Sequence, residues 1–337
     1  MEKIYYQTLK ETLFHEKLEN GLEVYLLPKI GFEKTYGLFS TRFGSIDTTF
    51  VPLGQKEMIK VEDGIAHFLE HKMFEQPDES DAFEKFSKWG ANANAFTNFT
   101  TTAYLFTTTE NFYDCLDHLF DYVQTPHFTD ENVEKEKGII AQEIKMYDDD
   151  PGWNVSFNAI KAMYVNHPVR VDIAGTVDSV YKITKEELYK CYNTFYNPGN
   201  MALFVIGDLE AEEFFDNVKK ANKYDMAKMD HEITRIYPEE PTTVNKKEII
   251  TQAPISMPIF NIGFKDDKVN IKGKELLRYE VITDILNDML FRRGSELYED
   301  LYMKGLINRS FGAGFTSQID YSFTTIGGET FLSYYLK

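Results

Sequence analysis

Two histidines and a glutamate stand close together in the segment His67-Phe68-Leu69-Glu70-His71. On a helix, residues four apart lie one above the other, so the imidazoles of His67 and His71 can bind one metal ion from the same face. Glu70 lies beside them, where a carboxylate can act as a general base towards water. This H-x-x-E-H order is the reverse of the commoner H-E-x-x-H zinc helix. The other interpretation is a surface helix that carries two solvated histidines.

A catalytic zinc needs a third protein ligand and an open position for water. The best donor is Glu143, which lies 72 residues after His71 in the helical segment EKEKGIIAQEIKMYDDD. Glu136 lies two helical turns earlier on the same face, where it could orient a ligand or hydrogen-bond to a substrate. Glu131 and Glu134 belong to the same helix, so composition alone does not single out this pair of glutamates.

Secondary-structure elements must hold the metal-binding segment in position. The sequence around this segment predicts strands and short helices. Residues 20–26 indicate a hairpin turn followed by a strand, and residues 35–45 continue as a second strand. Apolar residues at helical spacing predict a helix over residues 64–73, which carries the two histidines, and a second helix follows over 83–89. The segment 90–109 is rich in Thr and aromatic residues and predicts two further strands.

From residue 111 onward the sequence becomes helical. Thr129 is the expected N-cap of a long helix that runs to about Tyr147 and carries Glu143. Asp150 and Pro151 supply an N-cap and a first-turn proline, so the next helix should begin there. A buried strand is expected over residues 201–209.

A polar stretch rich in Glu and Pro predicts a division of the chain. We expect a metal-binding domain over 1–228, a linker over 229–246 and a second, partial domain over 247–337. The elements expected in this second part are strands near 247–251 and 258–264, helices over 275–291 and 295–303, and strands over 307–315 and 321–326. This order repeats that of the first hundred residues, so we interpret the chain as a duplication whose second copy is incomplete.

Composition disfavours several classes of function. The chain has 54 acidic and 36 basic residues and a formal net charge of -18, which opposes binding to nucleic-acid phosphates. The first residues lack the unbroken apolar core of a signal peptide, and no run of about 18 apolar residues could span a membrane. Cys115 and Cys191 are expected to be buried thiols in a reducing compartment, which favours the cytoplasm.

The stretches HFLEH, GANANAFT and EKEKGIIAQEI resemble the pitrilysin and insulinase family of zinc metallopeptidases, the inverzincins, which also include mitochondrial processing peptidase. A bacterial subgroup is especially similar, over about residues 14–328. The resemblance implies an α+β fold of duplicated domains, each an antiparallel sheet covered by helices. It also implies that His67, His71 and Glu143 bind Zn²⁺, that Glu70 is the catalytic base and that Glu136 is the accompanying acid.

The resemblance further implies a substrate-binding strand edge that pairs with an extended peptide. Its residues are Asn92, Ala93, Asn94, Ala95 and Phe96, and Asn94 matches an asparagine of the family. Backbone pairing at such an edge gives affinity without strict sequence preference. A strand with a purely structural role in the sheet would have the same sequence. One strand can serve both as part of the sheet and as a substrate-binding edge.

One departure from the family bears on partners. Active relatives carry an Arg and a Tyr in their second half, and the corresponding positions here are Tyr302 and Asn308, with Arg309 one residue away. In some family members one chain holds zinc while a paralogous chain without the zinc motif supplies this pair.

We therefore expect a zinc-dependent endopeptidase that cleaves peptides or small unfolded proteins. It would be the zinc subunit of a two-chain peptidase, or a homodimer, with weak or no activity alone. The alternative is a non-catalytic assembly subunit of the same fold, although such relatives have typically lost the zinc residues that are present here. We also hypothesise that the acidic charge lines a chamber that favours basic peptides.

Overall fold

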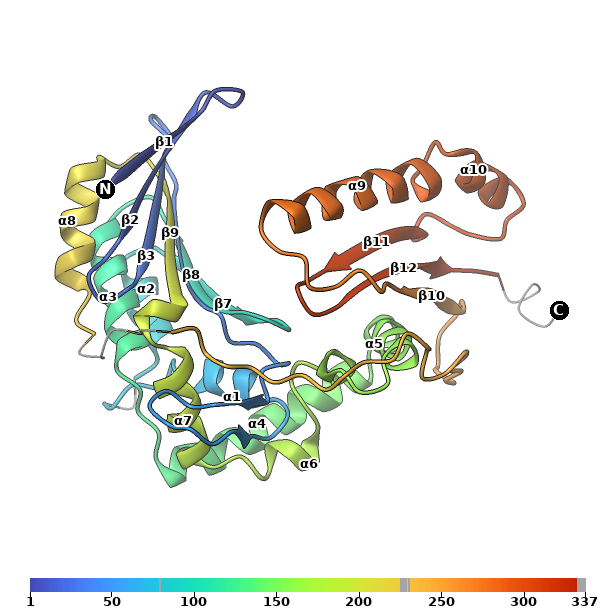
Figure 1. The fold of residues 1–337 in the computed structure, drawn as a ribbon, viewed down its shortest axis with the longest axis horizontal. Helices are drawn as coiled ribbons and strands as arrows, with labels where there is room; N and C mark the ends of the chain where they lie inside the picture. The colour runs from blue at the N-terminus through green and yellow to red at the C-terminus, as the bar shows by residue number, and fades with distance from the viewer. Residues whose placement is uncertain (79, 225–228, 230, 332–337) are drawn as a thin grey trace. The chain divides into compact units, whose positions relative to one another are not determined.

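The computed structural model describes residues 1–78, 80–224, 229 and 231–331 (Figure 1). The chain forms two compact units, one of Met1–Ile144 with Val171–Tyr237 and one of Lys145–Arg170 with Pro238–Lys337. Residue 228, the expected end of the first domain, and residue 230 of the expected linker lie outside the described residues. The domain limits therefore stay a prediction.

A seven-stranded sheet is the frame of the first unit. Its strands are β1 (Glu2–Tyr6), β2 (Glu11–Lys17), β3 (Glu23–Pro28), β4 (Thr35–Thr41), β7 (Asn92–Thr97), β8 (Thr102–Thr108) and β9 (Met201–Gly207). They are hydrogen-bonded in the order β1-β2-β3-β9-β4-β8-β7, so β1 and β7 are the edges. Two short strands, β5 (Thr49–Phe50) and β6 (Ile59–Lys60), pair with each other.

Local sequence explains most of this sheet. Every second side chain of β4 and of β9 is buried, as expected for strands with one face on a core. Gly21, with φ of 99°, makes the expected turn between β2 and β3. The sheet is antiparallel except where β9 enters beside β3 in parallel register.

Helices cover the sheet of the first unit (Figure 1). They are α1 (Ile65–Lys72), α2 (Ala82–Lys88), α3 (Phe112–Gln124), α4 (Asp130–Asp148, of which the residues from Lys145 on belong to the second unit), α6 (Val177–Val180), α7 (Lys185–Phe195) and α8 (Ala211–Ala221), with the short 3-10 turn η2 (Pro198–Asn200). A further 3-10 turn, η1 (Pro168–Arg170), belongs to the second unit. α1 contacts β7 and β8, α3 contacts β4 and β8, and α8 packs on α3. Between them lie fully buried aromatic residues such as Phe39, Phe68 and Tyr104, each worth about 1.5–3 kcal/mol of burial.

The second unit repeats the core topology of the first. Its elements are α5 (Pro151–Met163), β10 (Ile259–Lys265), α9 (Lys274–Phe291), α10 (Glu296–Met303), β11 (Gly312–Ser317) and β12 (Ser322–Glu329). The strand order β10-β12-β11 corresponds to β4-β8-β7, with two helices between the first strand and the hairpin in both units. The expected duplication is thus confirmed in topology, and the three corresponding strands are antiparallel in both copies. None of the described helices is long and apolar enough to cross a membrane.

Two expectations for the second unit are wrong. The segment 247–251 is not a strand. It runs beside α5 instead: Asn158 donates to Thr251 Oγ1 at 3.2 Å, and Lys246, just before the segment, donates its N–H to Ala162 O at 2.9 Å. The strand expected from residue 307 begins only at Gly312. Ile307 is instead buried in the small core of this unit.

Glu240 ties α5 to the second sheet. Its carboxylate accepts backbone N–H groups of Val165, Asn166 and His167 at 2.7–2.8 Å, and it pairs with Lys265 Nζ at 2.7 Å. Burial acts to raise the pKa of Glu240, but these donors outweigh it and lower that pKa to about 2. The ionised carboxylate therefore stabilises the second unit.

We expect Glu240→Gln to lower the free energy of unfolding of this unit by about 2 kcal/mol at pH 7, because hydrogen bonds to a charged group are lost. The folded pKa lies below the ordinary value of 4.5, so this contribution is complete above pH 4.5 and disappears as the pH falls towards 2. Denaturant unfolding at several pH values measures it. Glu239→Gln, at an exposed neighbour, is the control. A loss as large at pH 2 as at pH 7 would contradict the assignment.

Candidate metal centre

Helix α1 holds the two histidines and the glutamate of the motif in a fixed orientation. It begins after Gly64, whose φ of 89° and close approach to Ala174 O, 2.3 Å from where a Cβ would lie, exclude a larger residue. Ile65, Phe68 and Leu69 are buried in the core. The apolar face of α1 is therefore anchored, and the motif faces α4.

The structure brings the three predicted ligands together. α4 is capped by Thr129, whose hydroxyl accepts the N–H of Asn132 at 3.1 Å as expected, and it carries Glu143 to α1. Glu143 Oε1 lies 3.7 Å from His67 Nε2, and its Oε2 lies 3.4 Å from His71 Nε2. One potential ligand atom from each of these three residues lies within 4.8 Å of the other two.

The chemistry of these donors fits a zinc ion. Two imidazoles and one carboxylate form the donor set of many catalytic zinc sites. Burial and the neighbouring His71 lower the pKa of His67 to about 3, so its ring is neutral at neutral pH. A neutral imidazole is the form that coordinates a metal.

Glu136 lies behind His71 and orients it. Its Oε1 is 3.0 Å from His71 Nδ1, and the residue is buried, with 9% of its surface exposed. Burial acts to lower the pKa of His71, but the hydrogen bond to Glu136 and the charges of Glu136, Glu143 and Glu70 outweigh it and raise that pKa. A proton held on Nδ1 leaves Nε2 free for a metal.

We expect Glu136→Gln to weaken zinc affinity by about 10–100-fold, because the amide holds the His71 ring less firmly than a carboxylate. Competition with a chromophoric chelator measures the affinity. Glu212→Gln, at an exposed position of α8, is the matched control and should leave it unchanged. Equal affinities in the two variants would show that Glu136 does not orient the ligand.

Glu70 lies beside the ligands in a different environment. It is 7% exposed, and its Oε2 accepts the hydroxyl of Thr97 at 2.6 Å. Burial raises the pKa of Glu70, the Thr97 hydroxyl and His71 oppose this, and the net direction is upward. A carboxyl with a raised pKa is a better proton acceptor near neutral pH.

Thr97 is a site residue that sequence reasoning missed. Alternation along β7 places Ala93, Ala95 and Thr97 on the half-buried face and Asn92, Asn94 and Phe96 on the exposed face. Because side chains alternate between the two faces of a strand, the sequence already placed Thr97 on the same face as Ala93 and Ala95. In the structure this face is turned towards α1. The contact itself depends on how α1 packs on β7.

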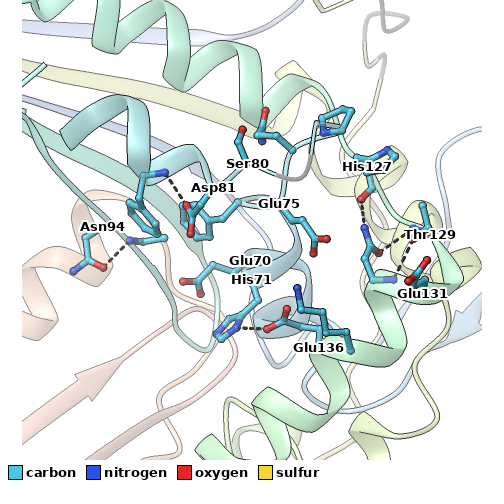
Figure 2. A pocket seen from close by; sticks show the side chains of 17 residues that line it. Glu70, His71, Glu75, Ser80, Asp81, Asn94, His127, Thr129, Glu131 and Glu136 are labelled. Carbon is cyan, nitrogen blue, oxygen red and sulfur yellow. Dashed lines mark hydrogen bonds and ion pairs between the residues drawn. The ribbon is translucent and has the colours of Figure 1, made fainter. Parts of the chain in front are cut away.

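The predicted substrate segment forms an edge of the sheet. β7 pairs with β8 over Asn92–Thr97 and is the last strand in the order, so its other side has no neighbouring strand in the described sheet. Asn94 and Ala95 also line a cavity of about 790 Å³ that reaches Glu70 and His71 (Figure 2). An open strand edge and a cavity thus meet at the candidate base.

The two positions that depart from the family pattern have local contacts in the second unit. Tyr302 stacks on Tyr298, with ring centroids 5.9 Å apart. The side chain of Asn308 donates to Glu329, and its Oδ1 accepts from Ser310. Both residues therefore have partners within the second unit.

Comparison with known proteins shows to which family this chain belongs. A profile described as Insulinase (Peptidase family M16) matches residues 50–177, and one described as Peptidase M16 inactive domain matches residues 182–331. A protein of Bacillus subtilis strain 168, named uncharacterized zinc protease YmfH, is 49% identical over 98% of this chain and 77% of its own length. The chain belongs to the insulinase family.

Solved structures of similar proteins agree. This insulinase-family chain matches a putative M16-like peptidase from Alicyclobacillus acidocaldarius at 41% identity and a TM-score of 0.90, over 95% of this chain and 75% of the other. A protease from Helicobacter pylori, at 21% identity, matches in fold with a TM-score of 0.76, over 94% of this chain and 75% of the other. The α+β fold of duplicated domains expected from the resemblance is confirmed.

Proposed function

We propose that this chain is a zinc-dependent endopeptidase that hydrolyses peptides or small unfolded proteins. The observation that carries the proposal is the convergence of His67, His71 and Glu143 within 4.8 Å, beside a buried Glu70 at an open strand edge. The relatives named zinc proteases support it. A non-catalytic assembly subunit, the alternative, would not need these residues.

Each residue has a separate task in the proposed mechanism. His67, His71 and Glu143 would hold the zinc, and Glu136 keeps His71 in the tautomer that turns Nε2 towards Glu143. Bound zinc lowers the pKa of a water molecule towards neutrality and polarises a peptide carbonyl. Glu70 takes the proton of the attacking water and delivers it to the leaving amine. The hydroxyl of Thr97 donates to Oε2 of Glu70, which leaves Oε1 without a hydrogen bond from Thr97.

The substrate would bind as an additional strand. We propose that an extended peptide pairs with the free side of β7 along Asn92, Ala93, Asn94, Ala95 and Phe96. Its scissile bond would then lie near Glu70, which the hydrogen bond from Thr97 links to the same strand. Main-chain pairing explains why a peptidase of this kind can accept varied sequences.

We infer that the active form has two chains, this one and either a paralogue without the zinc motif or a second copy. Tyr302 and Asn308 stand where active relatives have a substrate-orienting Arg and Tyr, and their local contacts support this inference. A cytoplasmic location is also proposed, and the two free, buried cysteines are compatible with it.

Incubation with a peptide mixture and zinc, followed by mass spectrometry, tests the proposed function. We expect cleavage that a chelator stops and that increases when the paralogous chain is added. Cleavage that is insensitive to chelation would contradict the zinc mechanism. Cleavage that does not increase with either a paralogue or chain concentration would contradict the two-chain form.

A further inference from the structure

Within the part of the chain that the structure describes, one side chain donates a hydrogen bond to the carboxylate of Glu70. The donor is the hydroxyl of Thr97, whose Oγ1 lies 2.6 Å from Oε2 of Glu70. Glu70 is buried, and a carboxylate that has been removed from water depends on the donors that the protein supplies. The orientation of this carboxylate therefore depends on Thr97.

The neighbourhood of Thr97 directs its hydroxyl proton to Glu70. A second oxygen, Oγ1 of Thr102, lies farther away, at 3.2 Å. Thr102 is fully buried, and its own hydroxyl donates to the backbone oxygen of Phe43 at 2.8 Å. A hydroxyl has one proton to donate, and its hydrogen bond to an ionised oxygen is the stronger one. The proton of Thr97 is therefore given to Glu70, the nearer of the two acceptors.

The hairpin of β7 and β8 fixes the place of Thr97. Thr97 and Thr102 face each other as the last pair before the turn of this hairpin. The side chain of Asn98 closes the turn, because its Oδ1 accepts the N–H groups of Thr100 and Thr101 at 2.9 and 2.8 Å. The backbone of Thr97 is thus held both by the ladder of the sheet and by the turn that follows it.

The segment after β4 packs on this turn and keeps it in place. Ser45 N donates to Asn98 O at 3.0 Å, and Ile46 N donates to Phe99 O at 3.1 Å. Gly44 lies so close to the turn that a Cβ at this position would come within 2.3 Å of the backbone of Phe99. The donor that Glu70 receives is therefore part of a rigid structure.

Glu70 needs such a donor because its own side chain is flexible. The last torsion of a glutamate has no sharp minimum, so an unbonded carboxylate turns easily. A general base must lie within about 2.6–3.2 Å of the group whose proton it takes. A displacement of about 1 Å can lower a catalytic rate by about a hundredfold.

We propose that Thr97 is the positioning residue of the candidate base, because its hydroxyl holds the carboxylate of Glu70 in the orientation from which it takes the proton of the attacking water. This inference rests on the proposed peptidase function. Thr97 acts through Glu70 in the way that Glu136 acts through His71, whose Nδ1 it contacts at 3.0 Å. The ligand and the base would thus each be oriented by one side chain from another element.

Two substitutions distinguish positioning from a purely structural role. Thr97→Val keeps the shape of the side chain and suits a strand, but it removes the donor. Thr97→Ser keeps the donor and removes the methyl group. A residue that is needed only for packing in β7 would tolerate Val better than Ser. A positioning residue would tolerate Ser and fail with Val.

Steady-state kinetics of the zinc-loaded variants, with the paralogous chain if activity requires it, measure this difference. We expect Thr97→Val to lower kcat by about tenfold to a hundredfold and to leave KM unchanged, whereas Thr97→Ser should stay within about threefold of the wild type. Zinc content should be the same in both. Thr107→Val, at the opposite end of the same hairpin, is the matched control and should leave kcat unchanged. Thr97→Ala, which also lacks the donor, replaces the Val variant if that chain does not fold.

Crystal structures of the variants provide a readout that does not depend on turnover. The carboxylate of Glu70 should keep its place in Thr97→Ser and turn away in Thr97→Val. A wild-type kcat in Thr97→Val, a Thr97→Ser chain that is as slow as Thr97→Val, or an unchanged Glu70 in the Val variant would each overturn the inference. If the wild type shows no cleavage that depends on Glu70, the proposed function fails and this inference fails with it.

Discussion

Glu70→Gln is expected to reduce peptide hydrolysis by about 10²–10⁴-fold, because the amide cannot accept the proton of the attacking water. The substitution keeps the size of the side chain and can keep the hydrogen bond from Thr97. The ligand atoms of His67, His71 and Glu143 are untouched, so zinc content should stay at that of the wild type. Initial rates with a fluorogenic peptide and metal analysis of the same preparations measure both quantities.

Glu84→Gln is the control for this substitution. It removes a carboxylate from an exposed position of α2 and should leave the rate unchanged. If Glu70→Gln retains wild-type cleavage, Glu70 is not the base. If it loses zinc together with activity, its role is structural.

His71→Ala is expected to abolish both zinc binding and hydrolysis. His71 contacts Glu136 through Nδ1 and faces Glu143 through Nε2, so its loss removes one donor and leaves the buried carboxylate of Glu136 and the half-buried carboxylate of Glu143 without this partner. The drop in zinc affinity should exceed the roughly 10–100-fold expected when only an orienting residue is changed. Equilibrium dialysis followed by atomic absorption measures the affinity.

His127→Ala is the matched control, because His127 lies near the site at the cavity but is not part of the three-residue ligand group. Its zinc content should equal that of the wild type. A His71→Ala chain that still binds one zinc with wild-type affinity would contradict the ligand assignment.

The parts of the fold that could be predicted from sequence depend on short-range chemistry. Asp150 caps α5 by accepting the N–H of Trp153 at 2.7 Å, as its place before Pro151 indicates. The spacing of His67 and His71 fixes their common face within one helix. In these cases the residues that interact are neighbours in the sequence.

The pairing of strands that lie far apart in the chain was harder to predict from the sequence. The parallel contact of β9 with β3 joins residues far apart in the chain, and alternation within each strand does not choose a partner. The segment 247–251 has the composition of a strand, but the hydrogen bond of its Thr251 is made with Asn158 of α5 and not with a neighbouring strand. Strand propensity describes what fits a sheet and does not show that a sheet is present beside it.

The candidate site also has a part that a short motif predicts and a part that depends on long-range packing. The two histidines and Glu70 follow from one short motif, whereas several glutamates of α4 were equivalent as third ligand until α4 was packed against α1. That packing places Glu143 at both Nε2 atoms and Glu136 at Nδ1 of His71. Thr97 was missed because its hydrogen bond to Glu70 crosses from a strand to a helix.

Zinc titration of the chelator-stripped chain, with peptide hydrolysis recorded at each addition, tests the central claim most directly. We predict that hydrolysis, with the paralogous chain present if required, rises until one zinc is bound per chain and then stays level. The Glu70→Gln chain should bind the same zinc and remain inactive. Full hydrolysis by the stripped wild-type chain, or equal hydrolysis by zinc-loaded Glu70→Gln, would contradict the account.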